Sequence, residues 1–385
     1  GLSVITRAGI PNALIRFTSI TYNNNNYNEF IKIIKFSFLL VFISSFLVLS
    51  VIIIFFNDLF LLLYSNYERT SSTVFLFIIL SLPFVSSLFL FRSIIKGFYR
   101  PALSALFEYE LSYYFIIIII LYLNFSGYLI YAKTLSISFL LFIILHFILS
   151  STYIYFLIKK KFTNNINNNK NSLFENFKKT LFDFFQIDFI NFILNWGGLL
   201  ILSLLSNEFV VGQFSTIYWL AISLLIIPVI LNTVTSPYYA AEFDKRNIKK
   251  IYSFMNRIIL LLSILIIPFI FFISNFSKYL LLIIYNESIG ELYIYFNILL
   301  FSVLFAVILG NCGAILSMCG YQKENKNIAI IYGLLLIILL IIFVPIYQFK
   351  AAVIVYSLSI IFKSLLVYIR TRIILKKILY NEVAN

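Results

Sequence analysis

Basic side chains inside long apolar stretches are the first residues of this sequence that could do chemistry. Arg7 lies near the start of the chain, and Lys363 lies midway through an apolar run near its end. A charge at the centre of a bilayer costs about 2.5–3.5 kcal/mol on insertion scales, so each is a candidate for function. The guanidinium of Arg7 offers a bidentate fork that matches phosphate oxygens. The alternative for both is that the charged end extends to the membrane surface.

A second polar group lies between residues 180 and 195. Asp183 follows Thr180 with the spacing of a helix cap, which is the role we expect for it. Asp188 lies about 140° around the helix from Asp183 and about 7.5 Å further along, so the two should not share a site. Asp188 is the candidate to bind Na⁺ or H⁺. Asn191 and Asn195 continue its face, either as a cavity wall suited to sugar hydroxyls or as a hydrogen-bonded seam between helices.

Motifs of soluble enzymes do not appear in the sequence. There is no His/Cys/Asp set with metal-ligand spacing, no phosphate-binding glycine loop and no nucleophile turn. The only histidine, His146, lies in an apolar segment, where we expect a packed, hydrogen-bonded neutral ring, with a proton relay as the alternative. Cys312 and Cys319 would lie roughly 10 Å apart along a helix, too far for a disulfide. Nothing in the sequence therefore indicates a soluble catalytic domain.

The composition indicates an integral membrane protein. Of the 385 residues, 62% are hydrophobic and 11% are charged, which leaves too little polar surface to cover a water-soluble globule. The net charge of +14 could suggest nucleic acid as a partner. The basic residues instead follow membrane topology, because they collect in alternate loops, all on one side except Arg69, Lys133, Lys278 and Lys350. That side is predicted to be cytosolic, together with the C-terminus.

Apolar runs of about 20 residues predict a polytopic all-α protein. The expected helices are 36–56, 72–92, 113–132, 135–157, 182–205, 212–234, 252–274, 292–316, 326–346 and 351–374. Residues 1–17 are expected to be the tail of an earlier helix that ends near Pro11, which suggests that a further N-terminal segment precedes Gly1. The external loops are expected to be short, the longest at about 275–291.

The Lys- and Asn-rich stretch 159–180 predicts a flexible cytosolic hinge, because it contains too little apolar surface to fold. The predicted domains are an N-terminal bundle (1–158), the hinge (159–180) and a C-terminal six-helix bundle (181–385). Residues 97–100 (GFYR) recur as 320–323 (GYQK), which favours two related, pseudo-symmetric halves. An intact protein of six plus six helices would then have about two more helices before Gly1.

Several short motifs resemble those of one transporter family. They are NWGG (195–198), NEFVVGQF (207–214), SPYYAAEF (236–243), GAILSMCG (313–320), VPIY (344–347), and AGI through LIRF (8–17). Together they resemble the polysaccharide flippases, of O-antigen and teichoic-acid type, of the multidrug/oligosaccharidyl-lipid/polysaccharide exporter superfamily. Gly198 stands where that family often has Asp, which argues against ion coupling through that position.

The resemblance implies a non-enzymatic transporter that moves a polyprenyl-diphosphate oligosaccharide, such as a lipopolysaccharide repeat unit, from the cytosolic to the outer leaflet. Such a substrate needs a cation for its diphosphate, for which Arg7 is the first choice and Lys363 the second. Arg16 would belong to a basic entrance vestibule, unless topology alone explains its position. Asn191 and Asn195 would bind sugars, and Asp188 would couple transport to a Na⁺ or H⁺ gradient without any other cofactor.

The resemblance also implies surroundings and alternatives. The protein is expected in the inner (cytoplasmic) membrane, with the lipid bilayer and other glycan-assembly membrane proteins as partners and with no nucleic acid. One alternative is a drug or metabolite exporter of the same superfamily or of the major facilitator type. Another is a membrane enzyme that polymerises or ligates the same glycans, although such enzymes usually present a large external loop.

Overall fold

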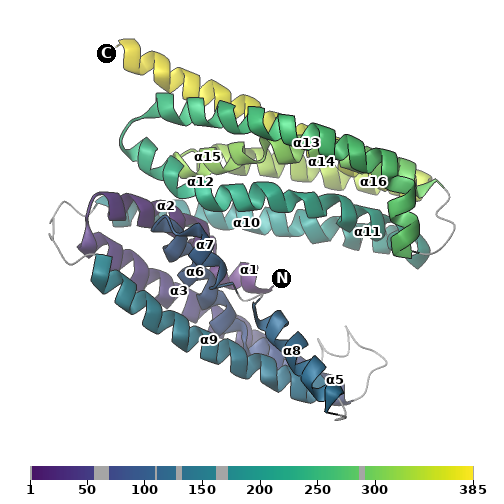
Figure 1. Ribbon diagram of the computed structural model, residues 1–385, viewed down its shortest axis with the longest axis horizontal. Helices are drawn as coiled ribbons and strands as arrows, with labels where there is room; N and C mark the ends of the chain where they lie inside the picture. Colours follow the sequence, from purple (N-terminus) through teal and green to yellow (C-terminus); the bar gives the residue numbers. More distant parts are fainter. Residues whose placement is uncertain are drawn as a thin grey trace. The chain divides into compact units, whose positions relative to one another are not determined.

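The computed structural model of the chain describes residues 2–55, 69–108, 111–126, 132–161, 172–285 and 291–384 (Figure 1). Within these ranges the regular secondary structure is entirely helical. Seven helical stretches of the described part are long and apolar enough to cross a membrane. The predicted all-α polytopic fold is therefore confirmed, and each predicted helix overlaps an observed one. The chain divides into two compact units, Gly1–Phe185 and Gln186–Asn385, which we describe separately.

The first unit is built from helices that surround a phenylalanine-rich core. The buried side chains Phe17, Phe30, Phe98, Phe177 and Phe184 form its largest members. The helices are α1 (Leu2–Arg7), α2 (Ile10–Asn23), α3 (Tyr27–Ile54), α5 (Arg69–Leu80), α6 (Leu82–Gly97), α7 (Pro101–Ala105), α8 (Leu111–Phe125), α9 (Ala132–Lys161) and the first part of α10 (Ser172–Leu205).

The start of the chain differs from the single helix tail predicted for residues 1–17. The backbone breaks between α1 and α2, where Ala8 and Gly9 have φ values of 47° and 71°. A Cβ atom on Gly9 would lie 2.2 Å from the backbone nitrogen of Phe185, so α10 packs directly against this break. Pro11 lies in the first turn of α2, where its missing N–H costs nothing. Pro11 therefore begins a helix instead of ending one.

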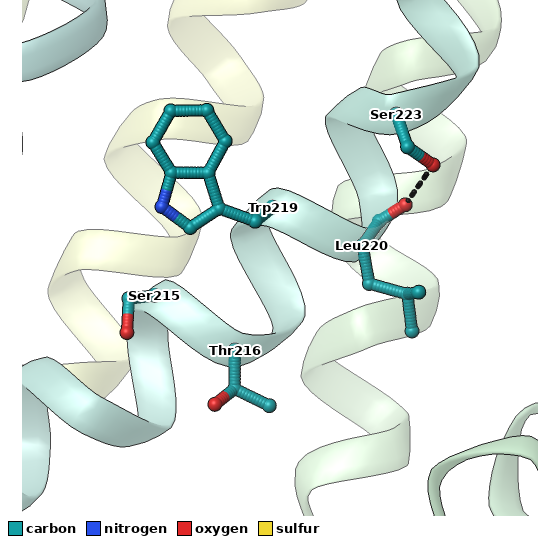
Figure 2. Close-up of a pocket in the computed structure, with 5 residues that line it drawn as sticks. All are labelled: Ser215, Thr216, Trp219, Leu220 and Ser223. Atoms are coloured by element: carbon teal, nitrogen blue, oxygen red, sulfur yellow. Dashed lines mark hydrogen bonds between the residues drawn. The ribbon is translucent and has the colours of Figure 1, made fainter. Parts of the chain in front are cut away.

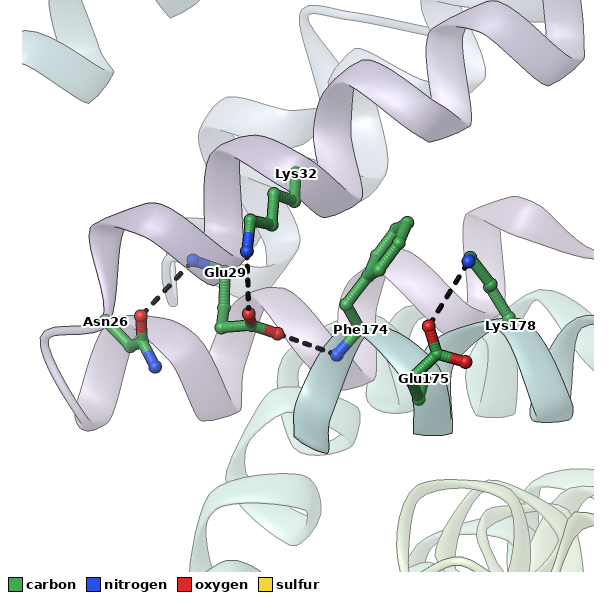
Figure 3. Close-up of polar contacts among 6 residues, drawn as sticks. All are labelled: Asn26, Glu29, Lys32, Phe174, Glu175 and Lys178. Carbon is green, nitrogen blue, oxygen red and sulfur yellow. Dashed lines mark hydrogen bonds and ion pairs between the residues drawn. The ribbon is translucent and has the colours of Figure 1, made fainter. Parts of the chain in front are cut away.

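The stretch 159–180, which was predicted not to fold, is helical wherever the structure describes it. Residues 162–171 lie outside the described part, but Lys159–Lys161 end α9 and Ser172–Thr180 begin α10. Figure 3 shows why the start of α10 is ordered: the Glu29 Oε2 atom accepts a hydrogen bond of 2.8 Å from the Phe174 backbone N–H. A carboxylate at a helix N-terminus also interacts favourably with the helix dipole. The role of this segment as a hinge stays a prediction.

Aromatic packing adds to the anchor at the start of α10. Phe174 and Phe177 contact the ring of Phe36 on α3, with centroid separations of 5.4 and 6.5 Å. The ammonium of Lys178 lies 4.3 Å from the Phe174 ring centroid and 3.3 Å from Glu175 Oε1 (Figure 3). These phenylalanines recur at helical spacing, so their burial outweighs the polar composition of the preceding stretch.

The second unit contains the rest of α10 and the C-terminal helices. These are α11 (Glu208–Ile222), the 3₁₀ turn η1 (Ser223–Leu225), α12 (Ile226–Asp244), α13 (Ile248–Tyr285), α14 (Leu292–Leu309), α15 (Asn311–Met318) and α16 (Gln322–Ala384). Because α13 continues to Tyr285, most of the predicted external loop 275–291 is helical.

A sharp kink divides α16 into two antiparallel halves. Gln348 has φ 45° and ψ −119°, and Figure 1 shows α16 turning back toward the C-terminus. The largest core cluster of the unit packs α11, α14 and both halves of α16 together, with Phe214, Val303, Leu340 and Tyr356 among its members. This packing brings residues that are far apart in the sequence to one level of the second unit.

Candidate functional site

Lys363 and Asn191 meet inside the second unit. The Lys363 Nζ atom donates a hydrogen bond of 3.2 Å to Asn191 Oδ1, so the structure joins two of the predicted site residues from α16 and α10. The same ammonium lies 4.7 Å from the ring centroid of Tyr332, a cation–π contact. Among the described residues, no carboxylate forms an ion pair with Lys363. A positive charge in a membrane-spanning helix is thus held only by neutral groups.

The kink at Gln348 explains how this site forms. Tyr332 and Lys363 lie almost equally far before and after Gln348, so antiparallel halves of α16 place them at the same level. At 1.5 Å per residue this level is about 23 Å from the kink. This distance is shorter than the hydrocarbon core of roughly 30 Å, so the charge lies within the span if the kink is at its surface. A charge inside the span is costly unless it serves a ligand or a partner.

Three buried tyrosines continue the site on its apolar side. Tyr218, Tyr332 and Tyr356 are each less than a tenth exposed, and the rings of Tyr218 and Tyr356 are 5.1 Å apart. The Tyr356 hydroxyl is buried and has no hydrogen-bond partner among the described residues. An unsatisfied buried hydroxyl costs about 1–3 kcal/mol, which a polar ligand or water would recover. The site thus presents the Lys363 ammonium, the Asn191 amide and the Tyr356 hydroxyl. Together these groups suit an anionic, oxygen-rich ligand.

The remaining predicted residues of α10 have different environments. Asp188 is half-buried in the same unit as Lys363. Asn195 lies in α10, but its side chain is outside the described part of the structure. Asp183 is 5% exposed and does not cap a helix, because α10 begins at Ser172. The capping prediction for Asp183 is therefore wrong, since the helix extends through the polar stretch that was expected to precede it.

Arg7 and Arg16 belong to the first unit. Arg7 is the last residue of α1, where its Nε atom donates to the Ser3 carbonyl oxygen at 2.8 Å and its guanidinium carbon lies 3.8 Å from the Phe89 ring centroid. Arg16 is half-buried on α2. The two arginines thus lie on separate helices instead of on two faces of one. Arg7 therefore rests on an aromatic face and is hydrogen-bonded to the backbone of its own helix.

Two polar features were missed or only partly predicted. The Arg92 guanidinium pairs with the Glu108 carboxylate, both largely buried, which sequence patterns did not indicate. On α12, Asn232, Thr235 and Tyr239 contact Asn311 on α15: the Asn311 amide donates to Asn232 Oδ1 and Thr235 Oγ1, each at 2.8 Å, and the Tyr239 hydroxyl donates to Asn311 Oδ1.

The α12 residues recur at i, i+3 and i+7, a signal that could have revealed the seam between α12 and α15. Every side-chain polar atom of Asn311 has a partner there, so this group stabilises packing. His146 is hydrogen-bonded as expected, with 2.9 Å between Nε2 and the Leu106 carbonyl oxygen. Its alternative role as a proton relay stays a prediction.

Comparison with known proteins shows the fold. No protein-family model matches the chain, and no curated protein sequence does. Solved structures do match over nearly its whole length. The Vibrio cholerae MATE transporter VcmN in the bent form has a TM-score of 0.74 at 11% identity, covering 98% of this chain and 86% of that one.

A MATE structure in the straight conformation has a TM-score of 0.77 at 12% identity, and the match covers 98% of this chain and 86% of that one. An outward-facing multidrug resistance MATE family transporter of the MOP superfamily has a TM-score of 0.75 at 12% identity, with the same coverage. The chain therefore has the fold of MATE transporters. The superfamily to which the motifs point, and its flippase branch, stay proposals.

Proposed function

We propose that this chain is a membrane transporter that works by alternating access and moves a polyprenyl-diphosphate-linked oligosaccharide from the cytosolic to the outer leaflet. The fold of MATE transporters supports the transport function, because its structural neighbours are transporters and not enzymes. The observation that carries the substrate assignment is Lys363, a cation in a membrane-spanning helix without a carboxylate partner among the described residues.

A diphosphate would supply the negative charge that this site lacks. The Lys363 ammonium uses one donor on Asn191 Oδ1, which leaves donors for phosphate oxygens. Charge-assisted hydrogen bonds of this kind are roughly twice as strong as neutral ones. Asn191, and Asn195 on the same face of α10, would bind sugar hydroxyls. Arg7 and Arg16 are proposed to bind the diphosphate and to guide the substrate in the first unit.

Coupling to an ion gradient is assigned to Asp188. Its carboxylate lies on α10 one turn before Asn191, so a proton or Na⁺ bound there would change the charge next to the proposed substrate site. We place the transporter in the cytoplasmic membrane with its C-terminus in the cytosol, where the positive-inside rule puts the basic ends of its helices. Membrane proteins of glycan assembly are the partners expected at both faces.

A drug or metabolite exporter is the second candidate. One structural neighbour is described as a multidrug resistance transporter, which favours this class. The charge of the site separates the two candidates: an uncompensated ammonium at Lys363 repels a cationic drug and attracts a phosphate. A glycan polymerase or ligase is a weaker candidate, because the observed fold is that of transporters.

The leaflet that holds the substrate tests the proposal. In cells that lack the intact gene, labelled lipid-linked repeat units should accumulate singly on the cytosolic face, and the wild-type gene should restore their outward movement. Accumulation on the outer face would contradict a flippase and support a polymerase or ligase. Normal export of glycan together with sensitivity to drugs would support the exporter.

A further inference from the structure

A pocket of about 380 Å³ opens on one face of α11 in the second unit. Its lining consists of Ser215, Thr216, Trp219, Leu220 and Ser223 (Figure 2). These residues recur at helical spacing on one face, whereas Phe214, Ile217 and Tyr218 of the same helix are buried in the core. Figure 2 shows the Trp219 ring standing away from the helix, with its indole nitrogen on the side of Ser215.

Polar groups that can make further hydrogen bonds line this pocket. The Ser215 and Ser223 hydroxyls donate to the carbonyl oxygens of their own helix, to Gly212 at 3.0 Å and to Leu220 at 2.8 Å, so their oxygens can still accept hydrogen bonds. Among the described residues, the Thr216 hydroxyl and the Trp219 indole N–H have no hydrogen-bond partner. The pocket therefore offers both donors and acceptors.

A second tryptophan lies against the first. The ring centroids of Trp196 on α10 and Trp219 are 5.3 Å apart with an interplanar angle of 52°, and the two side chains are 50% and 41% exposed. They are the only tryptophans of the sequence. Together with the pocket they form what we call the tryptophan platform, consisting of Trp196, Trp219, Ser215, Thr216 and Ser223.

The depth of the tryptophan platform distinguishes it from an interfacial aromatic belt. Trp219 lies about 16 Å from the start of α11, and Trp196 lies about 14 Å from the end of α10, by the rise of an α-helix. Both are therefore about halfway across a hydrocarbon core of roughly 30 Å, whereas belt tryptophans lie at its two surfaces. An unsatisfied N–H that faces lipid at this depth costs several kcal/mol. This face is better explained by a ligand with polar groups than by lipid.

We propose that the tryptophan platform binds a sugar ring of the transported glycan. A sugar ring presents polarised C–H bonds on its faces, which suit the negative π-face of an indole, and hydroxyls on its rim, which suit the indole N–H and the three hydroxyl side chains. The lining includes no acidic residue that would select a cationic ligand. The pocket is open and shallow, and its volume of about 380 Å³ is near the lower end of the range of small-molecule sites, which is about 300–1,000 Å³. The inference rests on the proposed function for the class of substrate.

Intrinsic tryptophan fluorescence of the full chain in detergent micelles tests this directly, because the chain contains only these two tryptophans and the detergent contains none. The probes are undecaprenyl diphosphate and the same lipid carrying a short oligosaccharide of N-acetylhexosamines or of hexoses. We expect only a glycosylated lipid to shift the emission, and to bind about tenfold more tightly than the bare lipid, a ratio equivalent to about 1.4 kcal/mol. Trp219→Ala should abolish this preference without weakening binding of the bare lipid, whereas Phe272→Ala on α13 should retain it.

Three other outcomes of this experiment would each reject the sugar site, and each has a different consequence for the proposed function. Equal binding of all three lipids without a change in emission would overturn the platform and leave the proposed function standing. If no lipid binds and methyl glycosides of the same sugars leave the emission unchanged, both the platform and the proposed function fail. Quenching by the planar cation ethidium, without any response to sugars, would reject the sugar site and favour a drug exporter.

Discussion

Replacing Lys363 by Met tests the central claim about the candidate site. The change keeps an unbranched apolar side chain against Tyr332 and removes the charge. Asn191 loses its hydrogen bond, which costs about 1 kcal/mol, while the cost of about 2.5–3.5 kcal/mol of a charge at membrane depth disappears. The protein should therefore be as stable as wild type or more so. A bound diphosphate would lose a charge-assisted hydrogen bond worth about 1.5–3 kcal/mol, so its affinity should fall about 10- to 150-fold.

The assay is binding of undecaprenyl diphosphate to purified protein in nanodiscs, combined with thermal unfolding of the same samples. Lys350→Met is the matched control, because Lys350 also lies on α16 but is exposed close to the kink. We expect the control to bind like wild type. Unchanged affinity in well-folded Lys363→Met would refute the anion site. A loss of more than about 2 kcal/mol in unfolding free energy would instead show that the ammonium stabilises the fold.

Three further predictions concern the packing that positions the sites, each measured by thermal unfolding in detergent. Gly9→Ala should destabilise the first unit by more than about 2 kcal/mol, because the left-handed backbone and the distance of 2.2 Å to the Phe185 backbone nitrogen both oppose a Cβ. The control Gly212→Ala has open space around it and should be neutral or stabilising. Asn311→Ala should cost about 2–4 kcal/mol by leaving its buried partners on α12 unsatisfied, and a change below about 1 kcal/mol would show that the seam relaxes. Glu29→Ala should cost about 1–2 kcal/mol by freeing the Phe174 backbone N–H in the first turn of α10, while Glu29→Gln, which keeps an acceptor, should cost less; equal losses would point to the charge.

The helices could be predicted from the sequence because apolar runs of bilayer length dominate it. The ends of the helices could not be predicted where tertiary contacts override local composition. Gly9 looks permissive in the sequence, and only the approach of Phe185 makes its left-handed conformation necessary. The polar residues 172–180 look flexible, and only the contacts of Phe174 with Glu29 and Phe36 reveal a helix there.

Two residues of the candidate site, Lys363 and Asn191, could be predicted from the sequence, but the three tyrosines and the geometry of the site could not. Lys363 stood out because a charge in an apolar run is rare, and Asn191 because it continues a polar face. Their contact depends on the kink at Gln348, a residue whose type gives no signal of a left-handed backbone. The tryptophan platform could not be predicted for another reason: aromatic residues are common at the surfaces of membrane proteins, and only the structure gives the depth of Trp219 along α11.

The candidate site around Lys363 and the tryptophan platform face different directions, which favours an extended substrate over a compact one. Asn191 and Trp196 lie on the same helix, about 7.5 Å apart along its axis and about 140° apart around it. The ammonium bound to Asn191 and the platform that includes Trp196 therefore face different directions, so a compact, drug-sized molecule would contact one of them at a time. A lipid-linked glycan carries its charge and its sugars on separate parts of a flexible molecule, so it can reach both. The separation of charge recognition from aromatic recognition is what such a substrate requires.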